Sequence, residues 1–280
     1  MAYSAEISRT HPSCFLLLVD QSGSMSDGFG GAKSGKSKAE CVADATNRLL
    51  QNLVIKCAKE EGIRDYYHVG VIGYGSAGIA PALAGPLAGK ELVAVSEIGT
   101  SPARVEQRAR KVDDGAGGLV EQQVRFPIWL DAAAKGGTPM LEALGLAHGI
   151  LSRWLAEHPS SFPPVVINIT DGESTDGDPM EAASRLQSLS TSDGNVLLFN
   201  LHLSSSAALP VEFPSDEALL PDKFASLLFR MSSELPDHMR DIALQEGKKV
   251  EGHARGFSFN ADLVSVIQFL DIGTRPAELR

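Results

Sequence analysis

Four apolar segments of the chain have the pattern of strands that are buried on both faces. They cover residues 14–19, 67–74, 165–170 and 195–203 and contain few polar side chains. Continuous apolar runs of this length are typical of strands in a parallel sheet, because helices cover both faces of such a sheet. Shorter strands are predicted at 92–98 and 256–259.

The segments between these runs have the periodicity of helices. In 38–59, apolar residues recur at spacings of three and four, which predicts an amphipathic helix. A second helix is predicted from Thr138 to about residue 157, with Thr138 as its N-cap and Pro139 as its first helical residue. The alternation of strands and helices predicts an α/β fold with crossover helices. Further helices are predicted at 179–189, at 222–247 with an interruption at Pro236, and at 261–270.

The alternation shows no internal repeat and no linker that would divide the chain. We therefore expect a single domain over residues 13–272, with terminal extensions at 1–12 and 273–280. Insertions are expected at about 75–128 and 204–247. The first of these is rich in Gly, Pro and Ala and then carries a charged piece at 104–114, so it holds either an edge hairpin or a small insertion.

Composition narrows the class of protein. The chain has 280 residues, of which 43% are hydrophobic, and this excludes a disordered chain. The net charge of −10 argues against nucleic acid and against an anionic membrane as the main partner. Cations, or basic patches on other proteins, remain as the expected binding partners.

The cysteines and the N-terminus bear on the compartment. Three cysteines are too few for a disulfide framework, and free buried thiols are the expectation. The N-terminal residues lack a basic segment followed by an apolar stretch and a cleavage site, so no secretion signal is expected. Both features predict a cytoplasmic location.

Oxygen-bearing side chains gather at three places that the predicted fold brings together. Asp20, Ser22 and Ser24 follow the first strand, Thr138 opens a helix, and Asp171 follows the third strand. Ligand sites of open α/β sheets lie at the carboxyl ends of the strands, so these residues are expected in one crevice. Two carboxylates and three hydroxyls are hard ligands that suit Mg²⁺ (or Mn²⁺). If the turn after the first strand stays extended, its three side chains face a common point.

This ordered set resembles the von Willebrand factor type A domain with its metal-ion-dependent adhesion site. The resemblance implies a Rossmann-like three-layer sandwich, in which a central, mostly parallel sheet is flanked by helices. It implies that Ser22, Ser24 and Thr138 supply hydroxyl oxygens to the metal, and that Asp20 and Asp171 act directly or through water. A carboxylate of a partner protein would complete the coordination.

The same resemblance implies a function. The chain would be a metal-dependent protein–protein interaction module without enzymatic activity, of the bacterial cytoplasmic type and within a signalling or stress-response assembly. The sequence departs from the family's pattern at two places beside the predicted site. These are the loop at 25–37 and the region at 75–125, which are both long. Partner identity and oligomeric state do not follow from the sequence.

A rival motif lies in the Gly/Lys loop at 27–37. Residues 30–37 match the phosphate-binding pattern G-x-x-x-x-G-K-S, which would make the chain a nucleotide hydrolase that uses Lys36 and Ser37. A phosphate-binding loop must leave a strand directly and enter a helix, whereas the first strand is predicted to end near Val19. A metal-free scaffold of the same fold is a further alternative.

Lysines of this loop and one histidine are the remaining candidates. Lys33, Lys36 and Lys38 are expected to form a basic rim near the metal that attracts an acidic partner. His202 follows core strand residues and has either a packing role or a functional one.

Overall fold

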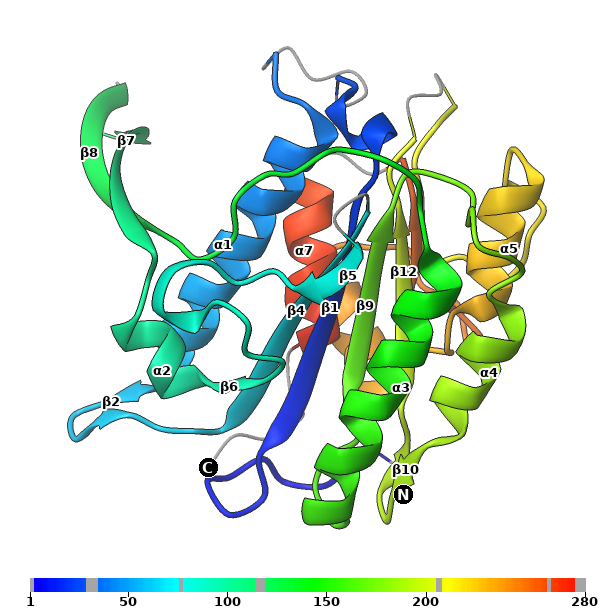
Figure 1. Cartoon of the computed structure of the whole chain (residues 1–280), viewed down its shortest axis with the longest axis horizontal. Helices are drawn as coiled ribbons and strands as arrows, with labels where there is room; N and C mark the ends of the chain where they lie inside the picture. Colours follow the sequence, from blue (N-terminus) through cyan, green and yellow to red (C-terminus); the bar gives the residue numbers. More distant parts are fainter. Residues whose placement is uncertain are drawn as a thin grey trace.

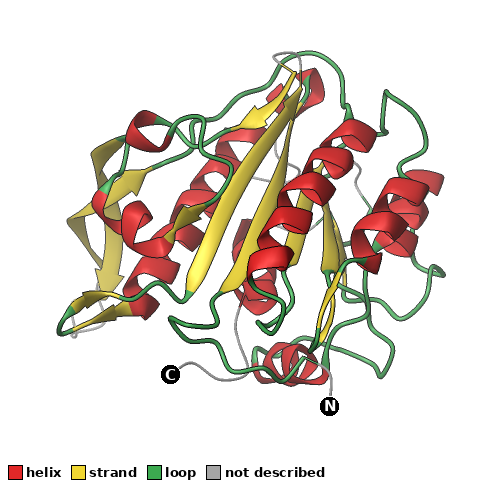
Figure 2. Ribbon diagram, turned by 60° about the horizontal axis from the view of Figure 1, so that its bottom comes forward, coloured by secondary structure: helices red, strands yellow, loops and turns green. Residues whose placement is uncertain are grey.

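The computed structural model describes residues 3–28, 35–75, 78–113, 119–204, 208–260 and 263–274. Within these residues, eight strands form a central sheet that lies between two layers of helices (Figures 1 and 2). This confirms the predicted α/β class with a mostly parallel sheet. No helix in the described ranges is both long and apolar enough to span a membrane.

The centre of the sheet is parallel and its edges are antiparallel. The parallel strands lie side by side in the order β14 (Phe257–Phe259), β12 (Leu197–His202), β9 (Val165–Thr170), β1 (Ser13–Gln21) and β4 (Tyr67–Gly75). One edge is extended by β13 (Val211–Glu212), and the other by β5 (Gly78–Pro81) and β6 (Val93–Ala94), which both pair with β4. The segment expected as the first insertion therefore supplies two strands to the main sheet.

Side chains of β1 alternate between two cores, one on each face of the sheet. Phe15 and Leu17 pack on the face of α1 (Lys38–Cys57), α2 (Val95–Thr100), α6 (Asp237–Gln245) and α7 (Leu263–Thr274). Leu16 and Leu18 pack on the face of α3 (Met140–Glu157), α4 (Met180–Ser188) and α5 (Lys223–Met231). Burial on both faces is the reason for the continuous apolar pattern of this strand.

The helical region predicted at 222–247 with an interruption at Pro236 is confirmed, as α5 and α6 on the two sides of that residue. Two local predictions differ from the structure. The strand predicted at 92–98 is limited to β6, and the chain continues as α2, which buries Val95 and Ile98. Thr138 is not the N-cap of α3: Pro139 holds that position and Met140 is the first helical residue. Thr138 therefore does not use its hydroxyl to cap the helix.

A long antiparallel hairpin, β7 (Arg104–Asp113) and β8 (Leu119–Ile128), points away from the body of the molecule (Figure 1). The charged piece therefore forms a hairpin, but one that is a separate two-stranded sheet and does not extend the edge of the main sheet. Arg108, midway along β7, holds the hairpin against α1: it donates to Asp44 at 2.7 Å and stacks 4.0 Å from the centre of the Phe126 ring.

Smaller elements complete the chain. They are the 3-10 helices η1 (Gly23–Ser26) and η2 (Gly85–Leu87) and the short pairs β2 (Ala58–Lys59) with β3 (Gly62–Ile63) and β10 (Ser190–Thr191) with β11 (Gly194–Asn195). The cysteines Cys14, Cys41 and Cys57 are buried and free, as expected. Burial raises the pKa of the Cys57 thiol to about 12, which keeps it protonated at neutral pH.

A histidine of β4 gives a prediction for stability against pH. The indole N–H of Trp154 donates to Nδ1 of His68 at 2.9 Å. An indole N–H can only donate, so Nδ1 accepts and the neutral ring carries its proton on Nε2. Burial, with His158 nearby, lowers the pKa of His68. The unfolded chain therefore binds this proton more readily than the folded one once the pH falls below about 6.5.

We expect the free energy of unfolding to fall as the pH is lowered from 7.5 to 5.5, and His68→Gln to make this fall shallower. Glutamine keeps an acceptor for Trp154 and has no proton to gain. The difference in slope is bounded by about 1.4 kcal/mol per pH unit for one group. Urea unfolding at several pH values measures it. Equal slopes for the wild type and His68→Gln would show that folding does not change the pKa of His68.

Candidate functional site

The residues predicted to bind a metal lie at the carboxyl edge of the sheet, where β1 and β9 end side by side. In the parallel register Val19 is opposite Ile169, so Asp20 and Asp171 leave neighbouring strands at nearly the same level. The loops after both strands therefore meet at one place, here called the crevice, which is where ligand sites lie in open α/β sheets.

Asp20 is fixed at the floor of this crevice. Its side chain is buried, and one carboxylate oxygen accepts the backbone N–H of Ser22 at 2.8 Å. The other oxygen accepts the hydroxyl of Thr170 at 2.6 Å. Burial raises the pKa of Asp20, and the nearby Asp171 adds to this against the opposing hydrogen bonds. A buried carboxylate of this kind gains from a cation close by.

Ser22 and Ser24 continue from Asp20 toward solvent. Their hydroxyl oxygens are 3.1 Å apart, and the hydroxyl of Ser24 donates to Oδ1 of Asp171 at 2.6 Å. The expectation of an extended turn is wrong here, because Gly23–Ser26 forms the 3-10 helix η1. Ser22 precedes it in an extended conformation, and the tight turn of η1 still brings both hydroxyls together.

Thr138 reaches the crevice through a loop that is tied to the other two. Its backbone N–H donates to the hydroxyl of Thr175 at 2.9 Å, and its carbonyl accepts the N–H of Thr175 at 2.9 Å. Its own hydroxyl oxygen would lie 3.9 Å from a Cβ built on Gly172. The Thr138 hydroxyl therefore faces the loop that starts at Asp171.

The loop before Thr138 is held against the end of β1 by backbone hydrogen bonds. The N–H of Lys135 donates to the carbonyl of Gln21 at 2.6 Å, and the N–H of Gly23 donates to the carbonyl of Gly136 at 2.8 Å. This close approach needs a glycine at the end of β4, because a Cβ at Gly75 would lie 2.6 Å from the Gln21 carbonyl oxygen.

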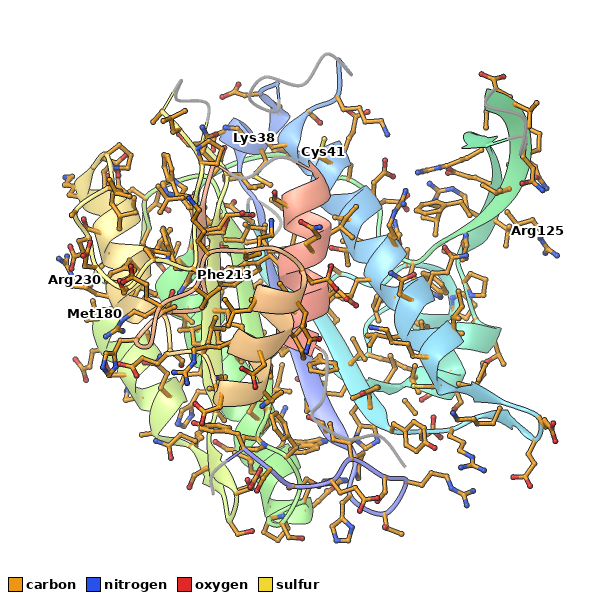
Figure 3. The ribbon with its side chains drawn as sticks, turned by 180° about the vertical axis from the view of Figure 1, so that it is seen from behind. Lys38, Cys41, Arg125, Met180, Phe213 and Arg230 are labelled. Carbon is orange, nitrogen blue, oxygen red and sulfur yellow. The ribbon has the colours of Figure 1, made fainter. Side chains whose placement is uncertain are left out.

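Lys38, the first residue of α1, is predicted near the metal as part of a basic rim, and it lies buried inside the same crevice rather than at its rim. Its ammonium donates to Oδ2 of Asp171 at 2.7 Å, and the two side chains are 4% and 0% exposed. Figure 3 shows Lys38 at the end of α1 that lies beside the strand-end loops. The predicted basic rim is wrong for Lys36, which pairs with Asp44 instead. Lys33 lies outside the described residues.

The described part of the phosphate-loop motif has other roles. β1 is followed by η1 rather than by a loop that enters α1 directly. Ser37 is the N-cap of α1 and forms a capping box with Glu40. The ammonium of Lys36 donates to Asp44 at 2.5 Å. The remaining motif positions up to residue 34 lie outside the described residues.

His202 borders the crevice from β12, where it is opposite Thr170. Its ring is 4% exposed and packs edge-on against Phe259. Nδ1 has no hydrogen-bond partner within the described residues, and burial lowers the pKa of the ring. A neutral imidazole is therefore expected behind Asp171 at neutral pH.

The donor set of the crevice suits a small hard cation. Within the described ranges, no group of three or more His, Cys, Asp or Glu side chains could hold a metal ion, so hydroxyl groups must contribute. The hydroxyl oxygens of Ser22 and Ser24 are 3.1 Å apart, and the Ser24 hydroxyl is 2.6 Å from Oδ1 of Asp171. Oxygens that bind one Mg²⁺ ion at about 2.0–2.1 Å lie at a similar distance from one another. Lys38 carries a positive charge into the crevice and therefore opposes a cation.

Comparisons with known proteins give a likeness of fold. No protein-family model matches the sequence, and no curated protein matches it. The vWF domain of the type V pili tip protein Mfa5 from Porphyromonas gingivalis aligns over 59% of this chain and 39% of that chain, at 12% identity and a TM-score of 0.33. The pilus adhesin RrgA from Streptococcus pneumoniae aligns over 59% of this chain and 21% of its own, at 16% identity and a TM-score of 0.30.

The PilB minor pilin from Streptococcus sanguinis aligns over 94% of this chain and 61% of its own, at 10% identity and a TM-score of 0.44. This chain thus spans less than two thirds of each of these proteins. A von Willebrand factor domain is among the similar structures.

Proposed function

We propose that this chain is a metal-dependent protein–protein interaction module, which binds Mg²⁺ or Mn²⁺ at the carboxyl edge of its sheet. The observation that carries the proposal is the set of linked oxygens of Ser22, Ser24 and Asp171, with Asp20 buried behind them. Their chemistry matches the ligands that hard divalent cations prefer.

Each residue of the crevice has a defined part in this proposal. Ser22, Ser24 and Thr138 supply hydroxyl oxygens, and Asp171 supplies a carboxylate oxygen. Both oxygens of Asp20 already accept hydrogen bonds from the protein, which favours a contact through water. When bound, the cation supplies a positive coordination position that a carboxylate of a partner can occupy.

The proposed partner is a protein that offers an Asp or Glu side chain. The chain as a whole carries a net charge of −10 and would repel such a group. At the crevice a divalent cation outweighs the charge of Asp20, since Asp171 is already paired with Lys38. An acidic side chain is therefore attracted to this edge of the sheet when the cation is bound.

The test of metal dependence is chemical unfolding in EDTA and in saturating Mg²⁺. Metal at about 100 times its dissociation constant is expected to raise the free energy of unfolding by about 2.7 kcal/mol. Ser24→Ala is expected to lose this gain. Ser26→Ala is the matched control, because Ser26 lies on the same turn but donates to the Gly23 carbonyl.

Two results would contradict the proposal. Equal stability of the wild type with and without Mg²⁺ or Mn²⁺ would favour a metal-free scaffold. ATP hydrolysis that is lost in Lys36→Ala would favour the nucleotide hydrolase. The interaction itself is measured by pull-down with the wild type and Ser24→Ala, in which the proposed partner is released by EDTA and rebinds when Mg²⁺ is restored.

A further inference from the structure

Lys38 is a buried lysine whose charge has one close partner in the described structure. Its side chain is 4% exposed, although lysines are almost never buried to this degree without a paired group. The partner is Oδ2 of Asp171 at 2.7 Å, and that carboxylate has no exposed surface. The ion pair therefore lies inside the crevice, where water screens charge poorly.

The two carboxylate oxygens of Asp171 accept hydrogen bonds from two different groups. Oδ1 accepts the hydroxyl of Ser24, on the side of the proposed metal ligands, and Oδ2 accepts the ammonium of Lys38. One carboxylate thus serves both the hydroxyl cluster and a fixed positive charge. A divalent cation bound to this cluster shares Asp171 with the ammonium and is repelled by it.

We propose that Lys38 is a built-in cation of the crevice, which holds Asp171 in place without metal and weakens the binding of a divalent cation. The inference rests on the proposed metal site and adds to it a residue that sets its affinity. The ammonium balances the charge of one of the two buried carboxylates of the crevice, those of Asp20 and Asp171.

A second acceptor lies on the outer side of Lys38. Oδ2 of Asp27 is 4.0 Å from the ammonium, and the Asp27 side chain is 62% exposed. The backbone N–H of Lys38 also donates to the Asp27 carbonyl at 2.9 Å, which keeps both residues together. When a divalent cation competes for Asp171, the ammonium can turn toward Asp27 and keep a partner.

The consequence is a gain in metal affinity when the charge is removed. Lys38→Gln keeps an N–H donor for Asp171 and lacks the positive charge. We expect it to bind Mg²⁺ and Mn²⁺ at least about tenfold more tightly than the wild type, since a neighbouring unit charge acts strongly in a buried site. Lys38→Arg keeps the charge and is expected to bind within about twofold of the wild type.

The experiment is a titration of the metal-free proteins with Mg²⁺ and Mn²⁺ by isothermal calorimetry, together with melting temperatures at each metal concentration. Lys36→Gln is the matched control for net charge, because it removes the same charge two residues earlier, where Lys36 pairs with Asp44. Its affinity is expected to equal that of the wild type.

The outcomes separate this inference from the proposed function. Tighter binding by Lys38→Gln, with unchanged binding by Lys38→Arg and Lys36→Gln, supports both. Binding by Lys38→Gln with none by the wild type supports the inference and overturns metal dependence of the natural chain. Binding by the wild type with no gain in Lys38→Gln overturns the inference alone. Absence of binding in every protein overturns both.

Discussion

Asp171→Ala is expected to lower the free energy of unfolding by about 3–5 kcal/mol in the absence of metal. The substitution leaves the ammonium of Lys38 buried, with its side chain 4% exposed and its 2.7 Å partner removed. The acceptor that remains, Oδ2 of Asp27, is 4.0 Å from the ammonium on a side chain that is 62% exposed, so it replaces the lost contact poorly. Loss of the close partner of a buried charge is among the costliest changes to a folded protein. Urea unfolding in EDTA measures the loss, and the exposed Asp241→Ala on α6 is the control, with an expected change within about 0.5 kcal/mol.

The origin of this loss is tested by removing both charges. The double variant Asp171→Ala with Lys38→Met is expected to be more stable than Asp171→Ala alone, because no unpaired charge remains. A coupling energy of about 0.5–3 kcal/mol between the two positions is typical of groups in contact. Additive effects of the two substitutions would show that the ion pair is not the source of the loss.

The site residues that the sequence predicts are those whose roles depend on local chain geometry. Asp20 lies at the end of a buried strand, Ser22 and Ser24 follow it, and Asp171 follows another strand, so strand order alone places them at one edge. The sequence places Lys38 near the proposed metal, but its burial and its pairing with Asp171 could not be predicted in this way. A lysine at a helix start normally extends into solvent, and its burial here depends on a contact with Asp171, 133 positions away in the chain.

In the fold too, elements that depend on the local sequence pattern could be predicted, and elements that depend on contacts distant in the chain could not. The central strands could be predicted because burial on both faces leaves a continuous apolar run. The segment at 92–98 was assigned wrongly because its alternation suits a strand, whereas 95–100 is the helix α2. Asp65 accepts the N–H of Ser96 at 2.9 Å and so satisfies a helix-start donor from outside the helix. A distant cap of this kind leaves no local signal.

A buried asparagine of α1 links the hairpin to the proposed site. Oδ1 of Asn47 accepts the backbone N–H groups of Trp129 and Leu130 at 2.8 and 3.0 Å. Its Nδ2 donates to the Leu130 carbonyl at 2.9 Å. These bonds fix the chain where it leaves β8. The proposed metal ligand Thr138 follows nine residues after Trp129. No strand or helix of its own supports this stretch.

Asn47→Ala is therefore expected to lower the free energy of unfolding by about 3–5 kcal/mol, because two backbone N–H groups and one carbonyl lose their partners in a buried place. The change also releases the segment that leads to Thr138, so faster amide exchange over 129–138 and weaker Mg²⁺ binding are expected. Urea unfolding and hydrogen exchange measure both effects. The control is Asn195→Ala at an exposed position. A loss no larger than that of Asn195→Ala, or unchanged exchange over 129–138, would mean that the segment is held by its other contacts.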